Sequence, residues 1–237
     1  VYRWQVFNGT SWLNVSGIKY SGGTSDSLVI NGVTSTMNNY RYRAIVSGTC
    51  SPNDTSLEAS LEVREKPEII IQPVSSVICE GTPVKFFVNA GVTTSPAYLW
   101  EVDPGTGFVP ASIANHSGYT TDTLSIIAAL SGMNGNDYRV TVSGICSPSL
   151  TSNVVTLTVN ELPEVISSPD DTTVCEGANI ALNVNAGVTT NPSYQWKVNG
   201  NNTGTNSSVF IYSPANNDDI TCVLTSNLGC ASGNPAT

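Results

Sequence analysis

The feature that most constrains the fold of this chain is an internal repeat with a period of 96 residues. Residues 90–100 read AGVTTSPAYLW, and residues 186–196 read AGVTTNPSYQW. The same period relates Trp4, Trp100 and Trp196. Solenoid units are much shorter, at about 20–50 residues, so this repeat has the length of a whole small domain.

The repeat predicts three successive domains with joints near residues 65 and 161. Residues 1–65 form a partial domain that lacks its N-terminal strands, residues 66–161 a complete domain, and residues 162–237 a domain that lacks its last strand. We call these segments the first, second and third repeats. The joints Glu65-Lys66-Pro67 and Glu161-Leu162-Pro163 are short and contain proline, which is typical of stiff spacers.

Composition excludes several classes of function. Only 11% of the 237 residues are charged and the net charge is −9, which argues against binding to nucleic acid, because that binding needs a basic surface. No apolar run reaches the roughly 18 residues of a membrane span, which argues against membrane insertion. The six cysteines form no CxxC pair and lie far apart, as in disulfide-bonded proteins that are secreted or on the cell surface. No motif calls for a cofactor or a metal.

The second repeat is a series of short strands separated by turns rich in Gly, Pro, Asn and Ser. An apolar run bracketed by prolines predicts an edge strand at Pro67–Pro73. Apolar residues, mostly in alternation, predict further strands at Ser76–Cys79, Val84–Val88, Tyr98–Val102, Leu124–Ile126, Asp137–Val142 and Val155–Val159. No segment has helical periodicity. This pattern predicts an all-β sandwich.

The order of these motifs resembles an immunoglobulin-like domain of the I type. Trp4, Trp100 and Trp196 correspond to the tryptophan that this fold buries on its third strand. Tyr42 and Tyr138 match its tyrosine corner, where the third repeat has Ile220. The usual pair of core cysteines is replaced by Val88 and Val140. The resemblance implies an all-β fold of tandem immunoglobulin-like sandwich domains arranged in a rod.

The placement of the cysteines, with sequences such as YQWKVNG and DITCVLTSNLGC, resembles a narrower family. These are the immunoglobulin-like repeats of large secreted surface adhesins of Bacteroidota-type bacteria, including gliding-motility adhesins exported by the type IX system. The resemblance implies a non-enzymatic spacer in the stalk of a cell-surface adhesin, in contact with neighbouring repeats of the same chain and with surface glycans or other cell-surface proteins. Two alternatives stay open, an accessory module of a secreted polysaccharide-degrading enzyme and a subunit of an extracellular filament or sheath.

Few residues outside the predicted core are candidates for a specific role. Trp12 and Phe108, which are 96 residues apart, are candidate contact aromatics or caps over the end of the sandwich. The single histidine, His116, is expected on the surface. The pairs Asp170-Asp171 and Asp218-Asp219 are expected to be solvated turn carboxylates rather than cation ligands. Ser27 and Thr123 resemble the Asp-Ser/Thr-apolar acceptor for O-linked glycans in these bacteria.

The immunoglobulin resemblance also implies a disulfide pairing. It places Cys79 and Cys146 at opposite ends of one domain, whereas Cys79 would face Cys230 across a joint. The expected bridge is therefore Cys79–Cys230, with Cys50, Cys146 and Cys175 awaiting partners in further repeats. Cys222 is either a free buried thiol or a partner for Cys175 or Cys230. The rival pairing, Cys79–Cys146 with Cys175–Cys230, would require a different strand order.

Overall fold

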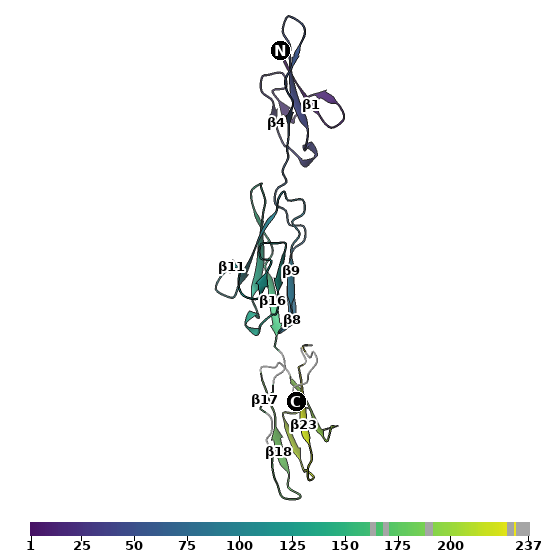
Figure 1. Ribbon diagram of the computed structural model, residues 1–237, viewed down its shortest axis with the longest axis vertical. Helices are drawn as coiled ribbons and strands as arrows, with labels where there is room; N and C mark the ends of the chain where they lie inside the picture. The colour runs from purple at the N-terminus through teal and green to yellow at the C-terminus, as the bar shows by residue number, and fades with distance from the viewer. Residues whose placement is uncertain (162–164, 168–170, 188–191, 227–229, 231–237) are drawn as a thin grey trace. The chain divides into compact units, whose positions relative to one another are not determined.

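The computed structural model describes residues 1–161, 165–167, 171–187, 192–226 and 230 (Figure 1). Across these ranges the chain consists of strands and turns, and its helical segments are two short 3-10 turns, Ser35–Met37 and Ser131–Met133. Contacts divide the chain into two compact units. One contains residues 1–68, 90–97 and 142–150, and the other contains the remaining residues.

The first unit is built on an antiparallel sheet with the strand order β2-β1-β5-β6, in which β7 also pairs with β5. Its strands are β1 (Tyr2–Phe7), β2 (Trp12–Asn14), β5 (Arg41–Val46), β6 (Asp54–Thr55) and β7 (Ala59–Ser60). A separate pair consists of β3 (Tyr20–Ser21) and β4 (Val29–Ile30).

Alternation along β1 and β5 decides which side chains of the first unit face its core. Val6, Tyr42 and Ala44 are buried, whereas their neighbours along the strands point outward. Trp4 also faces inward but is only half-buried.

The second repeat contains two sheets. The larger has the order β11-β10-β14-β16-β8, and β15 also pairs with β14. Its strands are β8 (Ser76–Cys79), β10 (Ala97–Asp103), β11 (Val109–Pro110), β14 (Asp137–Ser143), β15 (Leu150–Thr151) and β16 (Val155–Asn160). The smaller has the order β12-β13-β9, with β9 (Val84–Phe87), β12 (His116–Ser117) and β13 (Thr123–Ile126).

The core of the second repeat lies between these two sheets. Trp100 is fully buried, and its ring lies 6.4 Å from that of Phe86, which stacks at 4.9 Å on Tyr138. Leu124 of β13 and Leu157 of β16 complete this layer with no exposed surface. Inner faces of two sheets that bury one set of apolar side chains define a β-sandwich.

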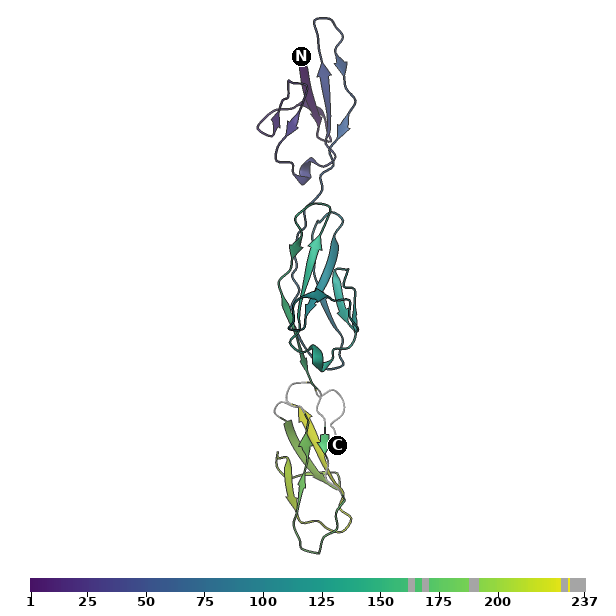
Figure 2. The same cartoon turned by 90° about the vertical axis from the view of Figure 1, so that its left-hand side faces the viewer.

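The third repeat has the same kind of strand arrangement, and Figure 2 shows its strands side by side. Its described strands are β17 (Val165–Ser167), β18 (Ile180–Asn183), β19 (Asn185–Ala186), β20 (Pro192–Val198), β21 (Asn201–Thr203), β22 (Val209–Tyr212) and β23 (Ile220–Ser226). Leu182, Val184, Trp196, Phe210 and Cys222 form its buried core. The Trp196 and Phe210 rings stack at 5.2 Å.

Most of the expected strands of the second repeat are present, and the first is the exception. Between Pro67 and Pro73 the backbone makes only an isolated antiparallel bridge, between Ile71 and Asn89, instead of a continuous strand. A proline at each end has no N–H to donate, which limits pairing to the middle of the segment. Val88 and Val140, expected at the core positions that usually hold cysteines, are both fully buried.

Candidate functional sites

The structure contains a disulfide between Cys79 of the second repeat and Cys230 of the third. Their Cα atoms lie 5.3 Å apart, although 151 residues separate them in the sequence. Cys79 is the last residue of β8 and is paired in register with Asn160, the last residue of β16. Two strands therefore hold Cys79 at the point where the second repeat leads into the third.

The four other cysteines are free thiols. Cys50 and Cys175 are exposed, Cys146 is partly buried, and Cys222 is buried in the core of the third repeat, where burial raises the pKa of its thiol. The Cys146 sulfur lies 3.4 Å from the carbonyl oxygen of Arg64. Neither bridge of the rival pairing, which would join Cys79 to Cys146 and Cys175 to Cys230, is formed.

The joint between the first and second repeats is held by the repeated AGVTT motif. The side-chain oxygen of Thr94 accepts a hydrogen bond from the Glu65 amide at 2.8 Å, and that of Thr93 accepts one from the Glu68 amide at 3.0 Å. A Cβ atom on Gly144 would meet Thr93 Cγ2 at 2.9 Å and the Thr94 carbonyl oxygen at 3.0 Å, so this close packing requires a glycine. The corresponding threonines of the third repeat, and Pro163 of the second joint, lie outside the described residues.

His116 lies against the core rather than free on the surface, which corrects the expectation from the sequence. Its ring stacks on Tyr138 at 5.8 Å, and its Nε2 atom lies 3.2 Å from the Tyr138 hydroxyl oxygen. Its Nδ1 atom lies 3.1 Å from the Ala114 carbonyl oxygen, which can only accept. Nδ1 therefore donates to Ala114, and Nε2 accepts from Tyr138. Burial lowers the pKa of His116.

The tyrosine corner consequently differs from the one that the resemblance implies. The Tyr138 hydroxyl group bonds to the side chain of His116, whereas a tyrosine corner bonds to backbone. In the first repeat Tyr20 takes the position of His116, and its ring lies 6.3 Å from that of Tyr42. Within the part of the chain that the structure describes, the buried Tyr42 hydroxyl oxygen has no hydrogen-bond partner. Burial, and then the neighbouring Tyr20, raise the pKa of Tyr42.

Trp12 and Phe108, the candidate contact aromatics, are half-buried side chains, and an arginine stacks on each ring. The guanidinium carbon of Arg43 lies 4.0 Å from the centre of the Trp12 ring. That of Arg139, 96 residues further on, lies 3.9 Å from the centre of Phe108. The sequence could not show this contact, because the arginines are on a distant strand, β5 or β14.

Each of these arginines also binds a side chain of the neighbouring strand. Arg43 donates two hydrogen bonds to the Gln5 side-chain oxygen, at 3.0 and 2.9 Å. Arg139 forms a 2.9 Å salt bridge with Glu101, the residue equivalent to Gln5. An aromatic ring, an arginine and an acceptor thus recur at matching positions of the first two repeats. Interactions of this kind contribute about 0.5–1 kcal/mol each at exposed sites.

Ser27 and Thr123 have the same local geometry. The Ser27 hydroxyl group donates to the Asp26 carboxylate at 3.2 Å, and that of Thr123 donates to Asp122 at 2.9 Å. The Ser27 carbonyl oxygen accepts a hydrogen bond from the Ser25 hydroxyl group, and the Thr123 carbonyl oxygen accepts one from the Thr121 hydroxyl group.

Among the acidic pairs, Asp218-Asp219 lies wholly within the described residues, and Asp218 is held by hydrogen-bond donors of the protein. Asp218 accepts hydrogen bonds from Asn199, Tyr212 and the Ala215 amide, and the donors lower its pKa. Asp170 lies outside the described residues. Over the part of the chain that the structure describes, no group of three or more His, Cys, Asp or Glu side chains could hold a metal ion.

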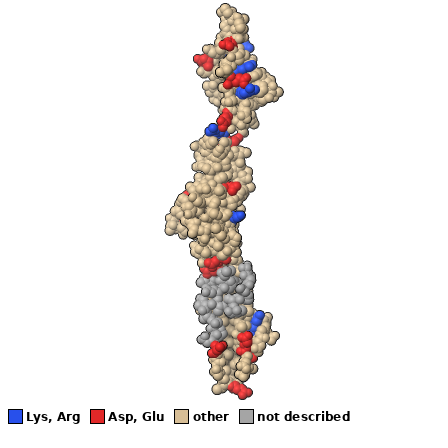
Figure 3. Space-filling model, in the orientation of Figure 1, with Lys and Arg blue, Asp and Glu red and all other residues tan. Residues whose placement is uncertain are grey.

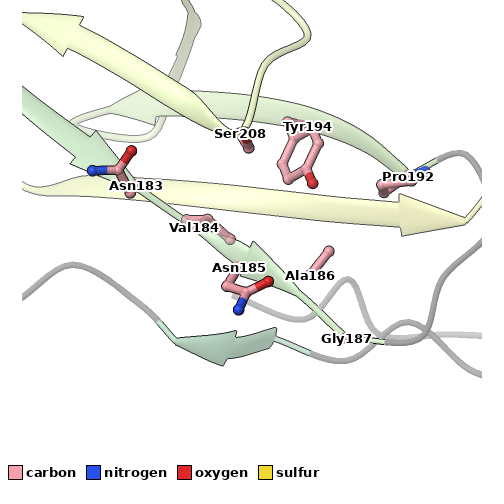
Figure 4. Close-up of a pocket in the computed structure, with 8 residues that line it drawn as sticks. All are labelled: Asn183, Val184, Asn185, Ala186, Gly187, Pro192, Tyr194 and Ser208. Carbon is pink, nitrogen blue, oxygen red and sulfur yellow. The ribbon is translucent and has the colours of Figure 1, made fainter.

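A small cavity of about 280 Å³ lies in the third repeat (Figure 4). Asn183, Val184 and Asn185 lie along one side of it, and Tyr194 and Ser208 lie across from them. Its described lining offers asparagine amides and the hydroxyl groups of Tyr194 and Ser208, which can form hydrogen bonds.

Comparisons with known proteins establish the fold of the chain. No model of a known protein family matches the sequence, and no curated protein sequence matches it. A three-domain immunoglobulin fragment of titin carrying Glu-to-Ala substitutions superposes with a TM-score of 0.59 at 15% identity, over 95% of this chain and 78% of the titin chain. A second I-band fragment of titin gives a TM-score of 0.57 at 15% identity, with the same coverage of both chains.

The chain therefore folds as tandem immunoglobulin-like β-sandwich domains. At 15% identity this likeness concerns the fold alone. Among the described residues, no helix is long and apolar enough to cross a membrane.

The half-buried His116 makes the stability of the second repeat depend on pH. Because its pKa is lowered in the folded state, the unfolded chain binds the proton more readily. The free energy of unfolding has its full value when the pH is above the pKa of histidine in the unfolded chain, about 6.5. It decreases as the pH drops below that pKa. His116→Tyr, which installs the residue found at the equivalent position of the first repeat, should remove this part of the pH dependence.

The measurement is an NMR titration of the imidazole, which gives one set of ring signals because the chain has one histidine. The expected midpoint lies below about 6.5. A midpoint at or above that value would show that the ring is not desolvated. Chemical denaturation of the wild-type chain and of His116→Tyr at several pH values provides the matched comparison.

Proposed function

We propose that this chain is a spacer segment in the stalk of a secreted cell-surface adhesin, and that it holds a distal binding region away from the cell. The observation that carries the proposal is the Cys79–Cys230 bond, which joins one repeat covalently to the next. A bond of this kind restricts rotation at the joint. A stalk that bears load needs this restriction, whereas a flexible linker does not.

The first joint supports the same role in a different way. Its backbone amides at Glu65 and Glu68 are hydrogen-bonded to the hydroxyl groups of Thr93 and Thr94, and Pro67 restricts the chain between them. A linker whose amides are occupied loses the freedom of a random coil. Each of the two joints in the sequence is thus a candidate stiff point, one through hydrogen bonds and one through a disulfide.

We further propose that Cys50, Cys146 and Cys175 take part in equivalent bonds between repeats. Cys146 and Cys175 lie 96 residues after Cys50 and Cys79, respectively, so they occupy repeated positions. The parent protein in this proposal is a gliding-motility type of adhesin exported by the type IX system. Its partners are neighbouring repeats, surface glycans and other cell-surface proteins.

Small-angle X-ray scattering tests the stalk role. A compact globule of 237 residues would have a radius of gyration of about 18 Å. A stalk of three stiffly joined domains should give a much larger value. Cys79→Ser should broaden the distribution of distances, because the second joint loses its bond. Cys50→Ser, which removes an exposed free thiol, is the control and should change nothing. A radius near that of a globule would contradict the proposal.

O-linked glycosylation of Ser27 and Thr123 is proposed from their shared geometry. Each hydroxyl group is oriented by the aspartate that precedes it in the chain. Intact-mass measurement of the natively secreted protein should show two glycan increments above the polypeptide mass. Ser27→Ala and Thr123→Ala should each remove one increment. A mass equal to that of the bare polypeptide would refute the modification.

A further inference from the structure

The outer side of the β1–β5 sheet in the first repeat carries a concentration of positive charge. Arg3, Gln5 and Phe7 alternate with core residues along β1, and Arg41 and Arg43 do the same along β5. The strands are in register, with Gln5 opposite Arg43 and Phe7 opposite Arg41. We call these five residues, together with Trp12, the basic face. It holds three of the nine Lys and Arg residues of a chain whose net charge is −9.

Two positive charges of the basic face are not neutralised by an acid within the described residues. Arg41 is paired with Glu58 at 2.6 Å. Arg43 binds only the neutral Gln5 side chain and stacks on Trp12. Arg3 is exposed and forms no salt bridge with any described residue. Figure 3 shows that charged side chains are sparse over much of the visible surface, and that basic and acidic side chains lie close together toward the N-terminal end.

The equivalent surface of the second repeat has the opposite charge. Its outward residues on β10 and β14 include Glu101, Asp103, Asp137 and Arg139, which we call the acidic face together with Leu99. Glu101 and Arg139 neutralise one another at 2.9 Å. Asp103 accepts hydrogen bonds from the Gly105 and Gly107 amides, and Asp137 accepts one from the Thr156 hydroxyl group. Within the described residues Asp137 has no salt-bridge partner, whereas Asp103, whose pKa is lowered first by the Gly107 amide, also interacts electrostatically with Arg139.

The two faces carry opposite net charge, although both have an arginine at one shared position, Arg43 or Arg139. Asp137 of the acidic face stands where the basic face has Arg41, and Asp103 stands where it has Phe7. Apolar surface accompanies the charges on both sides, from Phe7 and Trp12 on one and from Leu99, which is 38% exposed, on the other. In the third repeat Lys197 and Thr221, which pair across β20 and β23, occupy the positions of Glu101 and Arg139, and Asp219 occupies that of Asp137.

We propose that the basic face of the first repeat binds the acidic face of the second repeat in another copy of this chain. Sheets of the same fold pack face to face about 10 Å apart, and long side chains bridge this gap readily. Opposite charges favour the pairing of unlike faces, whereas like faces repel one another. The contact is lateral association between chains. It goes beyond the spacer role, which requires no association.

Sedimentation velocity of the full chain tests this contact. At up to about 500 µM and low salt, where a weak transient contact is populated, the wild-type chain should associate. Raising the ionic strength from about 0.01 M to about 1 M shortens the Debye length from about 30 Å to about 3 Å, and should dissociate the complex. A wild-type chain that stays monomeric at low salt would overturn the proposal.

Charge-reversed variants identify the faces. Arg3→Glu alters only the basic face and Asp137→Arg only the acidic face, and each should weaken association by about tenfold or more. An equimolar mixture should associate better than either variant alone, because one partner keeps an intact basic face and the other an intact acidic face. Lys85→Glu, on strand β9 of the smaller sheet, is the control and should leave association unchanged. Unchanged melting temperatures would show that the variants fold.

Three results would overturn the proposal at this stage. One is that all the variants associate as strongly as the wild-type chain. Another is that the equimolar mixture of Arg3→Glu and Asp137→Arg associates no better than either variant alone. The third is a monomeric wild-type chain that binds the acidic polysaccharide heparin and loses that binding in Arg3→Glu, which would assign the basic face to a glycan. None of these outcomes bears on the stiffness of the joints, so scattering still decides the spacer role independently.

Discussion

Packing of one inward-facing tryptophan per repeat is the interaction on which the arrangement of the strands depends. Trp100 and Trp196 are fully buried, and their indole nitrogens donate to the carbonyl oxygens of Thr121 and Ser207 at 2.9 and 2.8 Å. Trp4 donates to Ser25 at 3.0 Å in the same way. The hydrogen bond satisfies the only polar atom of each ring, so a large apolar side chain can be buried at no polar cost.

The inward tryptophan also determines what the outer surface presents. Because side chains alternate along a strand, Trp100 in the core places Glu101 outside, next to Arg139. The same alternation in the first repeat places Gln5 outside, next to Arg43. Gln5 and its counterpart Glu101 differ in charge, and both lie outside the core. The charge of this outer face can therefore differ between repeats without a change in the core behind it.

The sequence was sufficient for the fold because the relevant signals are periodic. Alternation located β9, β10, β13, β14 and β16, and the 96-residue spacing aligned the buried tryptophans. It was insufficient where a contact joins residues that are distant in the chain. The stacking of Arg43 on Trp12 depends on the register of β5 against β1, and the bond between His116 and Tyr138 depends on how two sheets face each other. Neither contact produces a pattern among residues that are close together in the sequence.

The link between successive repeats is the central claim, and disulfide mapping tests it most directly. Natively secreted protein, alkylated and digested without reduction, should yield a cross-linked peptide pair that contains Cys79 and Cys230. Cys222 should be recovered as a free thiol after denaturation, because it is buried in the core of the third repeat. A peptide pair that joins Cys79 to Cys146 would contradict the account, since that bond closes within one repeat and leaves the joint unlinked.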